Sequence, residues 1–521
     1  MSPDPGLTPE LRRQVTLLEP DLWVRVESQP EVLADWRTEY ETSRKRERTA
    51  ATWTSWRDER VTQAAVAWVL TTVFVRYCED NELIRPVWLS GPEHRRQEAQ
   101  DAQREYFRAN AMHTDREWIE QAVSYLAGMP ATRDLVDERS ALHWVAPSGD
   151  AAAALLAFWR ERDETGLLRD LTDSTLSTRF LGDLYQCISE SARTTYALLQ
   201  TPEFVEEFIL DRTLEPALAE RSLEGFRLID PTCGSGHFLL GAFHRFLDRW
   251  QKKEPGRETQ YLVQRALDAV HGVDVNPFAV AITRFRLTIA AIKAAGITRL
   301  ENAPAFNYHL AVGDSLWFGA PQQTLDYGAG HDDEPGLAGF TFSFEDRFVL
   351  REMLQPSRYD VVVGNPPYIT VKDKALNAAY RSFYSTCKGT YAMTVPFMEL
   401  FFNLAVQGTD IRPAGWVGQI TSNSFMKREF GAPLIERFLV KQDLRNVIDT
   451  SGAYIPGHGT PTVIIVGRNQ RPVGKTLRAV LGIRGEPSRP DDPAYVQQSG
   501  HPGRKGGSDV TGRQVQGSQP V

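Results

Sequence analysis

Apolar residues follow two different periods along the chain, and the change falls near residue 200. Before it, they recur at steps of three and four residues, which is the period of a helix with one buried face. The longest such stretch, 49–84, carries Trp53, Trp56 and Trp68 with charged residues between them. Shorter stretches of the same kind lie at 115–128, 150–163 and 178–199. We therefore expect an all-α domain over residues 1–198, serving as a scaffold or a partner-binding region.

From residue 199 onward, short β-branched runs alternate with helical patterns. Thr201 is suited to cap a helix whose first position is Pro202. Alternating strands and helices indicate a doubly wound α/β sheet, which we place at residues 199–482. The runs expected to be strands are 226–229, 271–275, 309–312, 360–363, 416–421, 446–449 and 462–466.

The last part of the chain has a different composition. From Glu486 onward it contains no Leu, Ile, Phe, Met or Trp and is rich in Gly, Pro, Gln, Ser and Asp. Such a segment cannot bury a core, so we expect residues 483–521 to be a disordered tail. This leaves no domain for reading a target DNA sequence.

The strand expected at 360–363 ends in Asn365, Pro366, Pro367 and Tyr368. Two prolines fix the backbone and remove two N–H donors, which leaves carbonyls and the asparagine amide at the carboxyl end of the strand. An adenine amine is a poor nucleophile because its lone pair is delocalised. Acceptance of its two N–H bonds by the Asn365 oxygen and the Pro366 carbonyl would localise that lone pair, while Tyr368 stacks on an extruded base. The alternative is an Asn-Pro turn with an exposed tyrosine.

Three acids also stand at three successive strand ends. Asp230 precedes Gly234 and Gly236, Asp274 follows the next strand, and Asp314 follows the third. The glycine loop has no Gly-Lys-Ser/Thr, and a leucine stands where a dinucleotide fingerprint needs its third glycine, so neither of those sites is indicated. Asp230 suits a cationic ligand group, Asp274 a ribose diol and Asp314 an adenine amine. Each acid alone is more often a strand-end cap.

Composition and charge limit the remaining classes. The formal net charge is -8, so any grip on DNA must be local or supplied by another chain. The one basic cluster, interleaved with tyrosines and a phenylalanine, contains Lys372, Lys374, Arg381 and Lys388. It is a candidate contact for a DNA backbone, and a solvated helix face is the alternative. The four cysteines form no Cys-x-x-Cys pair, and we expect no metal site. No signal region or membrane span is evident, which favours the cytoplasm.

The motifs DPTCGSG (230–236), GVDVNP (272–277), GDS (313–315) and NPPY (365–368) occur in the order typical of gamma-class N6-adenine DNA methyltransferases. The chain resembles this family, and VFVRYCEDNELI (73–84) is further similar to PglX methyltransferases of BREX and phage growth limitation systems. The resemblance implies S-adenosylmethionine as cofactor, DNA as substrate and other defence subunits as partners.

Roles for individual residues also follow from the resemblance. Asp230, Gly234 and Gly236 would line the methionine moiety, Asp274 the ribose and Asp314 the adenine ring. Thr201 and Pro202 would lie on the methionine carboxylate side, and NPPY would be the catalytic loop. Members of the family carry a carboxy-terminal target recognition domain, so its absence suggests a truncated member.

Two other functions remain open. Release-factor glutamine methyltransferases also carry NPPY followed by isoleucine, as Ile369 follows here, because a glutamine amide poses the same nucleophile problem. The large helical region and the Thr201–Pro202 segment favour DNA. The chain could also be a catalytically idle defence subunit that only binds the cofactor.

Overall fold

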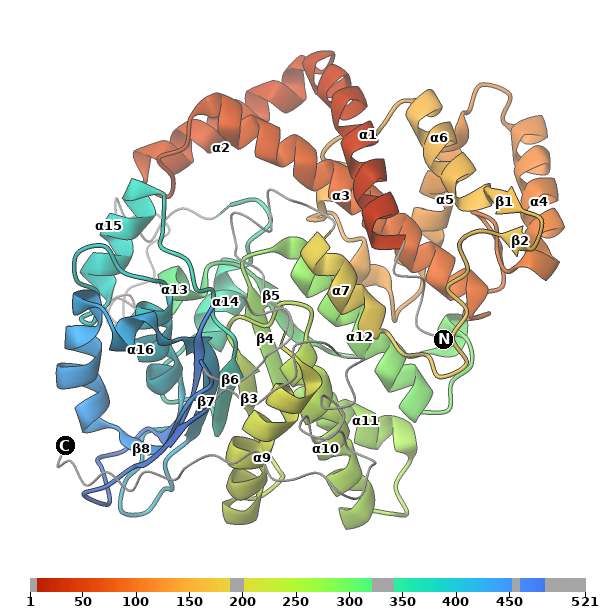
Figure 1. The fold of residues 1–521 in the computed structure, drawn as a ribbon. Coiled ribbons are helices and arrows are strands. Elements are labelled where there is room, and N and C mark those ends of the chain that lie inside the picture. Colours follow the sequence, from red (N-terminus) through yellow and green to blue (C-terminus); the bar gives the residue numbers. More distant parts are fainter. Residues whose placement is uncertain (1–6, 188–200, 321–341, 452–459, 483–521) are drawn as a thin grey trace.

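The computed structural model describes residues 7–187, 201–320, 342–451 and 460–482 of the chain. Figure 1 shows a helical region, drawn in red to yellow, beside a mixed sheet that is covered by helices. The predicted tail, residues 483–521, lies outside the described residues.

The amino-terminal region is built mainly of helices, as the three- and four-residue periodicity predicts. One expected helix, 115–128, has the bounds given by the sequence pattern. A hairpin of two-residue strands, β1 (Arg162–Asp163) and β2 (Gly166–Leu167), interrupts the helices. The helices are α1 (Leu7–Glu27), α2 (Pro30–Lys45), α3 (Trp53–Asp80), α4 (Arg96–Ala109), α5 (Asp115–Gly128), α6 (Gly149–Arg160) and α7 (Arg179–Cys187).

Helix α3 is the central element of this region. It begins after Thr52, whose hydroxyl accepts the Ser55 N–H, and most of its residues are buried. Although the sequence suggested no membrane span, α3 is long and apolar enough to cross a membrane; 89% of its most apolar window is nevertheless buried inside the protein. It therefore has the surroundings of a core helix.

The VFVRYCEDNELI stretch at the end of α3 organises the backbone around it. The Glu79 carboxylate accepts hydrogen bonds from the backbone N–H groups of residues 88, 89, 90 and 91, at 2.6 to 3.2 Å. Asp80 accepts the Leu171 N–H at 2.8 Å, and Arg76 forms an ion pair with Asp80 at 2.5 Å. These three side chains are almost wholly buried. This part of the sequence signature thus has a structural role.

The second region contains an eight-stranded sheet in the order β10-β8-β9-β7-β6-β3-β4-β5. The four strands that lead to the motifs, β3 to β6, are parallel to their neighbours, whereas β9 runs antiparallel to both β7 and β8. The strand β10 has no counterpart in the sequence analysis. The bounds are β3 (Leu228–Asp230), β4 (Val270–Asp274), β5 (His309–Val312), β6 (Val361–Gly364), β7 (Trp416–Ser422), β8 (Asp443–Asp449), β9 (Thr462–Arg468) and β10 (Arg478–Leu481).

Helices cover both faces of the sheet, and this confirms the doubly wound α/β class. Successive side chains of a strand point to opposite faces, so Val361 and Val363 join one hydrophobic core and Val362 joins the other. The first face carries α9 (Glu203–Glu220), α10 (His237–Lys253), α11 (Thr259–Asp268) and α12 (Pro277–Ala294). The second carries α13 (Ser315–Phe318), α14 (Arg347–Met353), α15 (Lys374–Phe383) and α16 (Thr394–Leu404).

The core on the first face continues without interruption into the helical region. Phe74 of α3 stacks on Phe285 of α12 with ring centroids 4.5 Å apart. Because the two regions share this core, a domain boundary at residue 198 stays a prediction.

We expect Glu79→Ala to lower the free energy of unfolding by about 3 to 5 kcal/mol. The reason is that buried backbone N–H groups lose their acceptor and the buried Arg76 charge loses a neighbouring carboxylate. Glu82→Ala is the matched control, since Glu82 is exposed and pairs only with exposed His94. Urea denaturation of both variants measures the difference. Equal midpoints would contradict the structural role of Glu79.

Candidate active site

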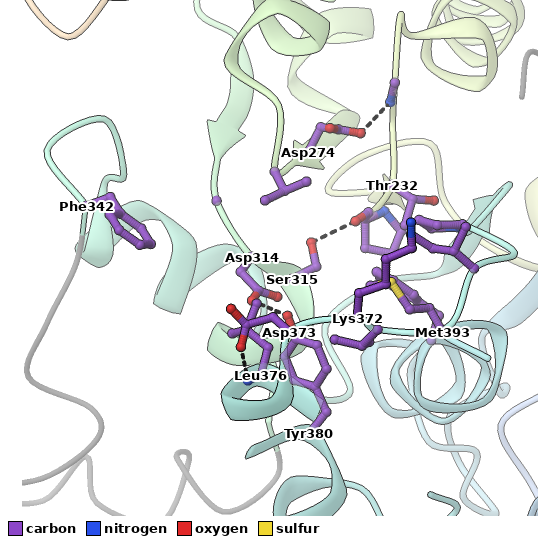
Figure 2. A pocket seen from close by; sticks show the side chains of 18 of the residues that line it. Thr232, Asp274, Asp314, Ser315, Phe342, Lys372, Asp373, Leu376, Tyr380 and Met393 are labelled. Atoms are coloured by element: carbon purple, nitrogen blue, oxygen red, sulfur yellow. Dashed lines mark hydrogen bonds between the residues drawn. The ribbon is translucent and has the colours of Figure 1, made fainter. Parts of the chain in front are cut away.

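A cavity of about 910 Å³ opens at the carboxyl ends of the parallel strands. This is the edge at which open α/β sheets bind ligands. The cavity wall includes Asp230, Asp274, Asp314 and Asn365, so the sheet brings together four of the residues singled out in the sequence. Figure 2 shows Asp274, Asp314 and the Thr232 loop around this space.

Asp230 ends β3 and is almost wholly buried. Its Oδ1 accepts the N–H and the hydroxyl of Thr232, at 2.9 and 3.1 Å. Its Oδ2 has no hydrogen-bond partner within the described ranges. Burial raises the pKa of this carboxyl group to about 8, partly offset by the Thr232 hydrogen bonds. A buried carboxylate oxygen that has no hydrogen-bond partner in the described ranges is suited to bind a cationic group such as an ammonium.

The glycine loop joins Asp230 to Asp274. Gly234 adopts φ +53°, has open space where a side chain would be, and donates its N–H to Asp274 Oδ2 at 2.9 Å. Asp274 Oδ1 accepts the Asn276 N–H at 2.8 Å, and burial raises the pKa of Asp274 to about 6. Each oxygen keeps a lone pair, so Asp274 can still accept from a diol.

Gly236 lies outside the cavity wall, at the start of α10. It adopts φ +80°, and a Cβ there would lie 2.7 Å from Thr283 Cγ2. The residue therefore allows α10 to start against α12. Contact with a ligand through Gly236 stays a prediction without support from its position.

Asp314 lies at the end of β5 and is anchored at both oxygens. Oδ1 accepts the Trp317 N–H at 3.0 Å as the cap of α13, and Oδ2 accepts the Tyr380 hydroxyl at 2.5 Å. The simple explanation, a strand-end cap, thus accounts for part of this residue. Its remaining lone pairs face a cavity in which an adenine amine can be bound.

The NPPY loop follows β6 directly. Asn365 and Pro367 line the cavity, whereas Pro366 is buried. The Tyr368 hydroxyl donates to Asn365 Oδ1 at 2.6 Å, and burial raises the pKa of Tyr368. The tyrosine is therefore not exposed, as a simple turn would have left it. The oxygen expected to accept from a substrate amine is instead held by the phenol.

Thr201 does not cap the following helix. Pro202 is the cap residue, Glu203 is the first residue of α9, and no side-chain capping bond forms. Instead Thr201 Oγ1 accepts a hydrogen bond from Asn365 Nδ2 at 3.3 Å, and Thr201 lines the cavity. The Thr201 hydroxyl thereby helps to orient the Asn365 amide.

The four basic candidates divide into two pairs. Lys372 and Lys374 are exposed and line the cavity. Arg381 donates to Asn377 and to the Gly389 carbonyl, and Lys388 pairs with Glu429 at 2.9 Å.

The aromatic side chains between these cations are buried, so a contact of theirs with DNA stays a prediction without support from their position. They are Tyr380, which also lines the cavity, and Phe383, Tyr384 and Tyr391.

Sequence reasoning missed a whole wall of the cavity, which comes from the helical region. Its residues include Arg48, Thr49, Trp56 and Arg60, and Phe342 lies across from the acids in Figure 2. Arg48 forms an ion pair of 2.9 Å with Glu345, in which both side chains are buried. Only the aromatic and arginine content around the start of α3 could have drawn attention to these residues.

Comparison with known proteins shows similarity to adenine-specific methyltransferases. The description "Eco57I restriction-modification methylase" matches residues 268–455. Adenine-specific methyltransferase PglX of Streptomyces coelicolor is 50% identical over 96% of this chain and 43% of its own length. The similarity to this methyltransferase thus extends over nearly the whole of this chain. The Type II methyltransferase M.PaeR7I of Pseudomonas aeruginosa is a more distant relative, 26% identical over 56% of this chain and 46% of its own.

One solved structure supports the fold. The ATP-dependent Type ISP restriction-modification enzyme LlaBIII bound to DNA has a TM-score of 0.51 and 13% identity, over 92% of this chain and 30% of that chain. The chain spans less than half the length of the curated relatives described above. Similarity to the methylase family implies S-adenosylmethionine as the cofactor.

Replacement of Asp230 tests the cationic-ligand assignment through stability. The folded pKa of about 8 exceeds the usual 3.8, so ionisation of Asp230 costs stability increasingly as the pH rises from about 4 to 8. We expect Asp230→Asn to stabilise the cofactor-free protein by the order of a few kcal/mol at pH 8 and by less at pH 5. Urea denaturation at both pH values measures this.

The same variant should bind S-adenosylmethionine more weakly in calorimetry, since a neutral amide cannot pair with the ammonium group. Tighter cofactor binding by Asp230→Asn, or an equal gain in stability at both pH values, would contradict the assignment.

Proposed function

We propose that this chain transfers a methyl group from S-adenosylmethionine to the N6 amine of adenine in DNA, within a phage-defence or restriction-modification system. One observation carries the proposal: a single cavity joins the Asn365 amide to the carboxylates of Asp230 and Asp274. Similarity to PglX, which covers nearly the whole chain, points the same way.

The residues present fit the cofactor. Asp230 Oδ2 is available to an ammonium group, Asp274 to a ribose diol, and Gly234 leaves open space for close backbone approach. The cofactor supplies an electrophilic methyl group when bound. Asp314 and Thr201 complete the proposed cofactor wall, the latter through its hydrogen bond to Asn365.

The NPPY loop provides the chemistry on the substrate side. Asn365 Oδ1 and the Pro366 carbonyl would each accept one N–H of the adenine amine, which favours a tetrahedral nitrogen with a localised lone pair. No strong base is needed, because the amine loses its proton only after it has been methylated. Pro366 and Pro367 hold the loop, and Tyr368 would leave Asn365 and stack on the base.

DNA binding by this chain alone should be weak. Its net charge is -8, and within the described part of the chain Lys372 and Lys374 are the predicted contacts that line the cavity. Other subunits of a defence system would then supply affinity or target choice. Action on chromosomal or phage DNA would place the protein in the cytoplasm.

Incubation of the chain with tritiated S-adenosylmethionine and duplex or single-stranded DNA tests the function. Label should appear as N6-methyladenine, and Asn365→Ala should reduce the rate by 100-fold or more, as loss of a preorganised acceptor does. Cofactor binding in calorimetry serves as the folding control. Label in a protein substrate instead would favour glutamine methylation, and bound cofactor with no transfer at all would favour an idle subunit.

The Tyr368 hydroxyl should be dispensable, whereas its ring should not. Tyr368→Phe removes the hydrogen bond that holds Asn365 Oδ1 and keeps a stacking face. We expect kcat/KM for DNA at or above the wild-type value in Tyr368→Phe. In Tyr368→Ala it should fall about 5- to 150-fold, because stacking on a base is worth about 1–3 kcal/mol. Equal loss in both variants would show that the hydroxyl itself acts in the reaction.

A further inference from the structure

The segment between α2 and α3 reaches from the helical region into the wall of the active-site cavity. Arg48, Thr49 and Ala50 line the cavity together with the residues that follow the NPPY loop. Two contacts fasten the segment there: the buried Arg48–Glu345 ion pair and a set of hydrogen bonds to Asp373.

Asp373 uses its two oxygens for two different purposes. Oδ1 accepts the N–H groups of Ala375 and Leu376, at 2.8 and 3.2 Å, and so caps α15. Oδ2 accepts the Ala50 N–H at 2.5 Å and the Thr49 hydroxyl at 3.1 Å. One carboxylate therefore joins the helical region to the start of α15.

The joined stretch is the one that leaves the catalytic loop. Ile369 accepts the Met393 N–H at 2.8 Å, and Thr370 pairs with Ala392, so the stretch is also held by the residues that precede α16. Asp373 is the next fixed point. Lys372 and Lys374 flank it, and Figure 2 shows Lys372 and Asp373 at the cavity.

We propose that Asp373 is a positioning residue for DNA: by fastening this stretch to Thr49 and Ala50, it sets Lys372 and Lys374 at the cavity mouth to meet the phosphates beside an extruded adenine. This rests on the proposed function and names how the helical region takes part in it. Exposed lysine side chains bind phosphates more tightly when the backbone that carries them is already fixed. Otherwise the entropy lost on ordering that backbone reduces the affinity. The helical region thereby acts in DNA binding without any base contact of its own.

The substitution Asp373→Asn separates the two purposes. An amide keeps an oxygen that can cap α15, but its nitrogen would face the Ala50 N–H donor, so the 2.5 Å bond to Ala50 is lost and the tie to the helical region is weakened. The chain offers a matched control in Asp346. That carboxylate also caps a helix, α14, and also reaches the helical region, through Arg139 at 3.2 Å, but it lies outside the cavity wall.

The experiment compares the wild type, Asp373→Asn, Asp346→Asn and the Lys372→Ala/Lys374→Ala double variant as full chains. Calorimetry measures S-adenosylmethionine affinity, and fluorescence anisotropy measures binding of a short duplex as a function of salt. In Asp373→Asn we expect cofactor affinity within about twofold of wild type and DNA affinity about tenfold weaker. The slope of log K against log salt should fall by about one to two, as it does when phosphate contacts are lost.

The double lysine variant should show the same loss, and addition of Asp373→Asn to it should cost little more, because both act through the same contacts. Asp346→Asn should bind DNA as the wild type does. Unchanged DNA affinity and slope in Asp373→Asn would overturn the proposal, as would a loss of DNA affinity by Asp346→Asn equal to that of Asp373→Asn.

A parallel loss of cofactor affinity, or additive losses on combination with the lysines, would equally overturn it. These readouts need no methyl transfer, so failure of the proposed function appears separately, as cofactor and DNA binding without labelled product. A wild type that does not bind DNA at all would reject the positioning role.

Discussion

The parallel hydrogen bonding of β3, β4, β5 and β6 is the constraint on which the site depends. Leu228 pairs with both Val270 and Val361, so three strands that are distant in sequence start in register. Their carboxyl ends therefore meet at one edge. Asp230, Asp274 and Asn365 converge because the backbone ladder aligns the residues that precede them. A slip of one residue in β6 would turn Val361 and Val363 toward the wrong core and move the loop that begins at Asn365 with them.

Carboxylates that accept hydrogen bonds from backbone N–H groups hold several irregular segments of the described part of this protein. Glu79 gathers the backbone after α3, Asp314 caps α13, Asp373 caps α15, and Asp274 holds the glycine loop. An ionised acceptor makes stronger hydrogen bonds than a neutral one, and each carboxylate offers several lone pairs. Several acids that a reader of the sequence would assign to catalysis or to surface charge are thus needed for shape. Asp274 and Asp314 additionally keep lone pairs that can accept from a ligand in the cavity.

Much of this arrangement is predictable from the sequence because it is local. The β-branched run before Asn365 and the acids at strand ends define the strands and the edge where they end. The amphipathic period likewise locates 115–128 as a helix to the residue. What could not be predicted depends on long-range packing. The contact of Thr201 with Asn365, the burial of Tyr380 and Tyr384, and the wall supplied by Arg48 and Trp56 all join segments with no sequence relation. The strand β9 was predicted but its antiparallel direction was not, since the direction of a buried apolar strand leaves no mark in its composition.

The stacking of Phe74 on Phe285 has a consequence for how such proteins can be rearranged. A fragment that began at residue 199 would present the face of α12 to water, with an apolar area that α3 now covers. Soluble chains rarely tolerate a large exposed apolar surface of this kind. The helical region therefore cannot be exchanged freely between enzymes. Any replacement for it would have to reproduce the side chains that contact α12. Sequence differences among relatives with this architecture should accordingly be concentrated away from the contact between α3 and α12.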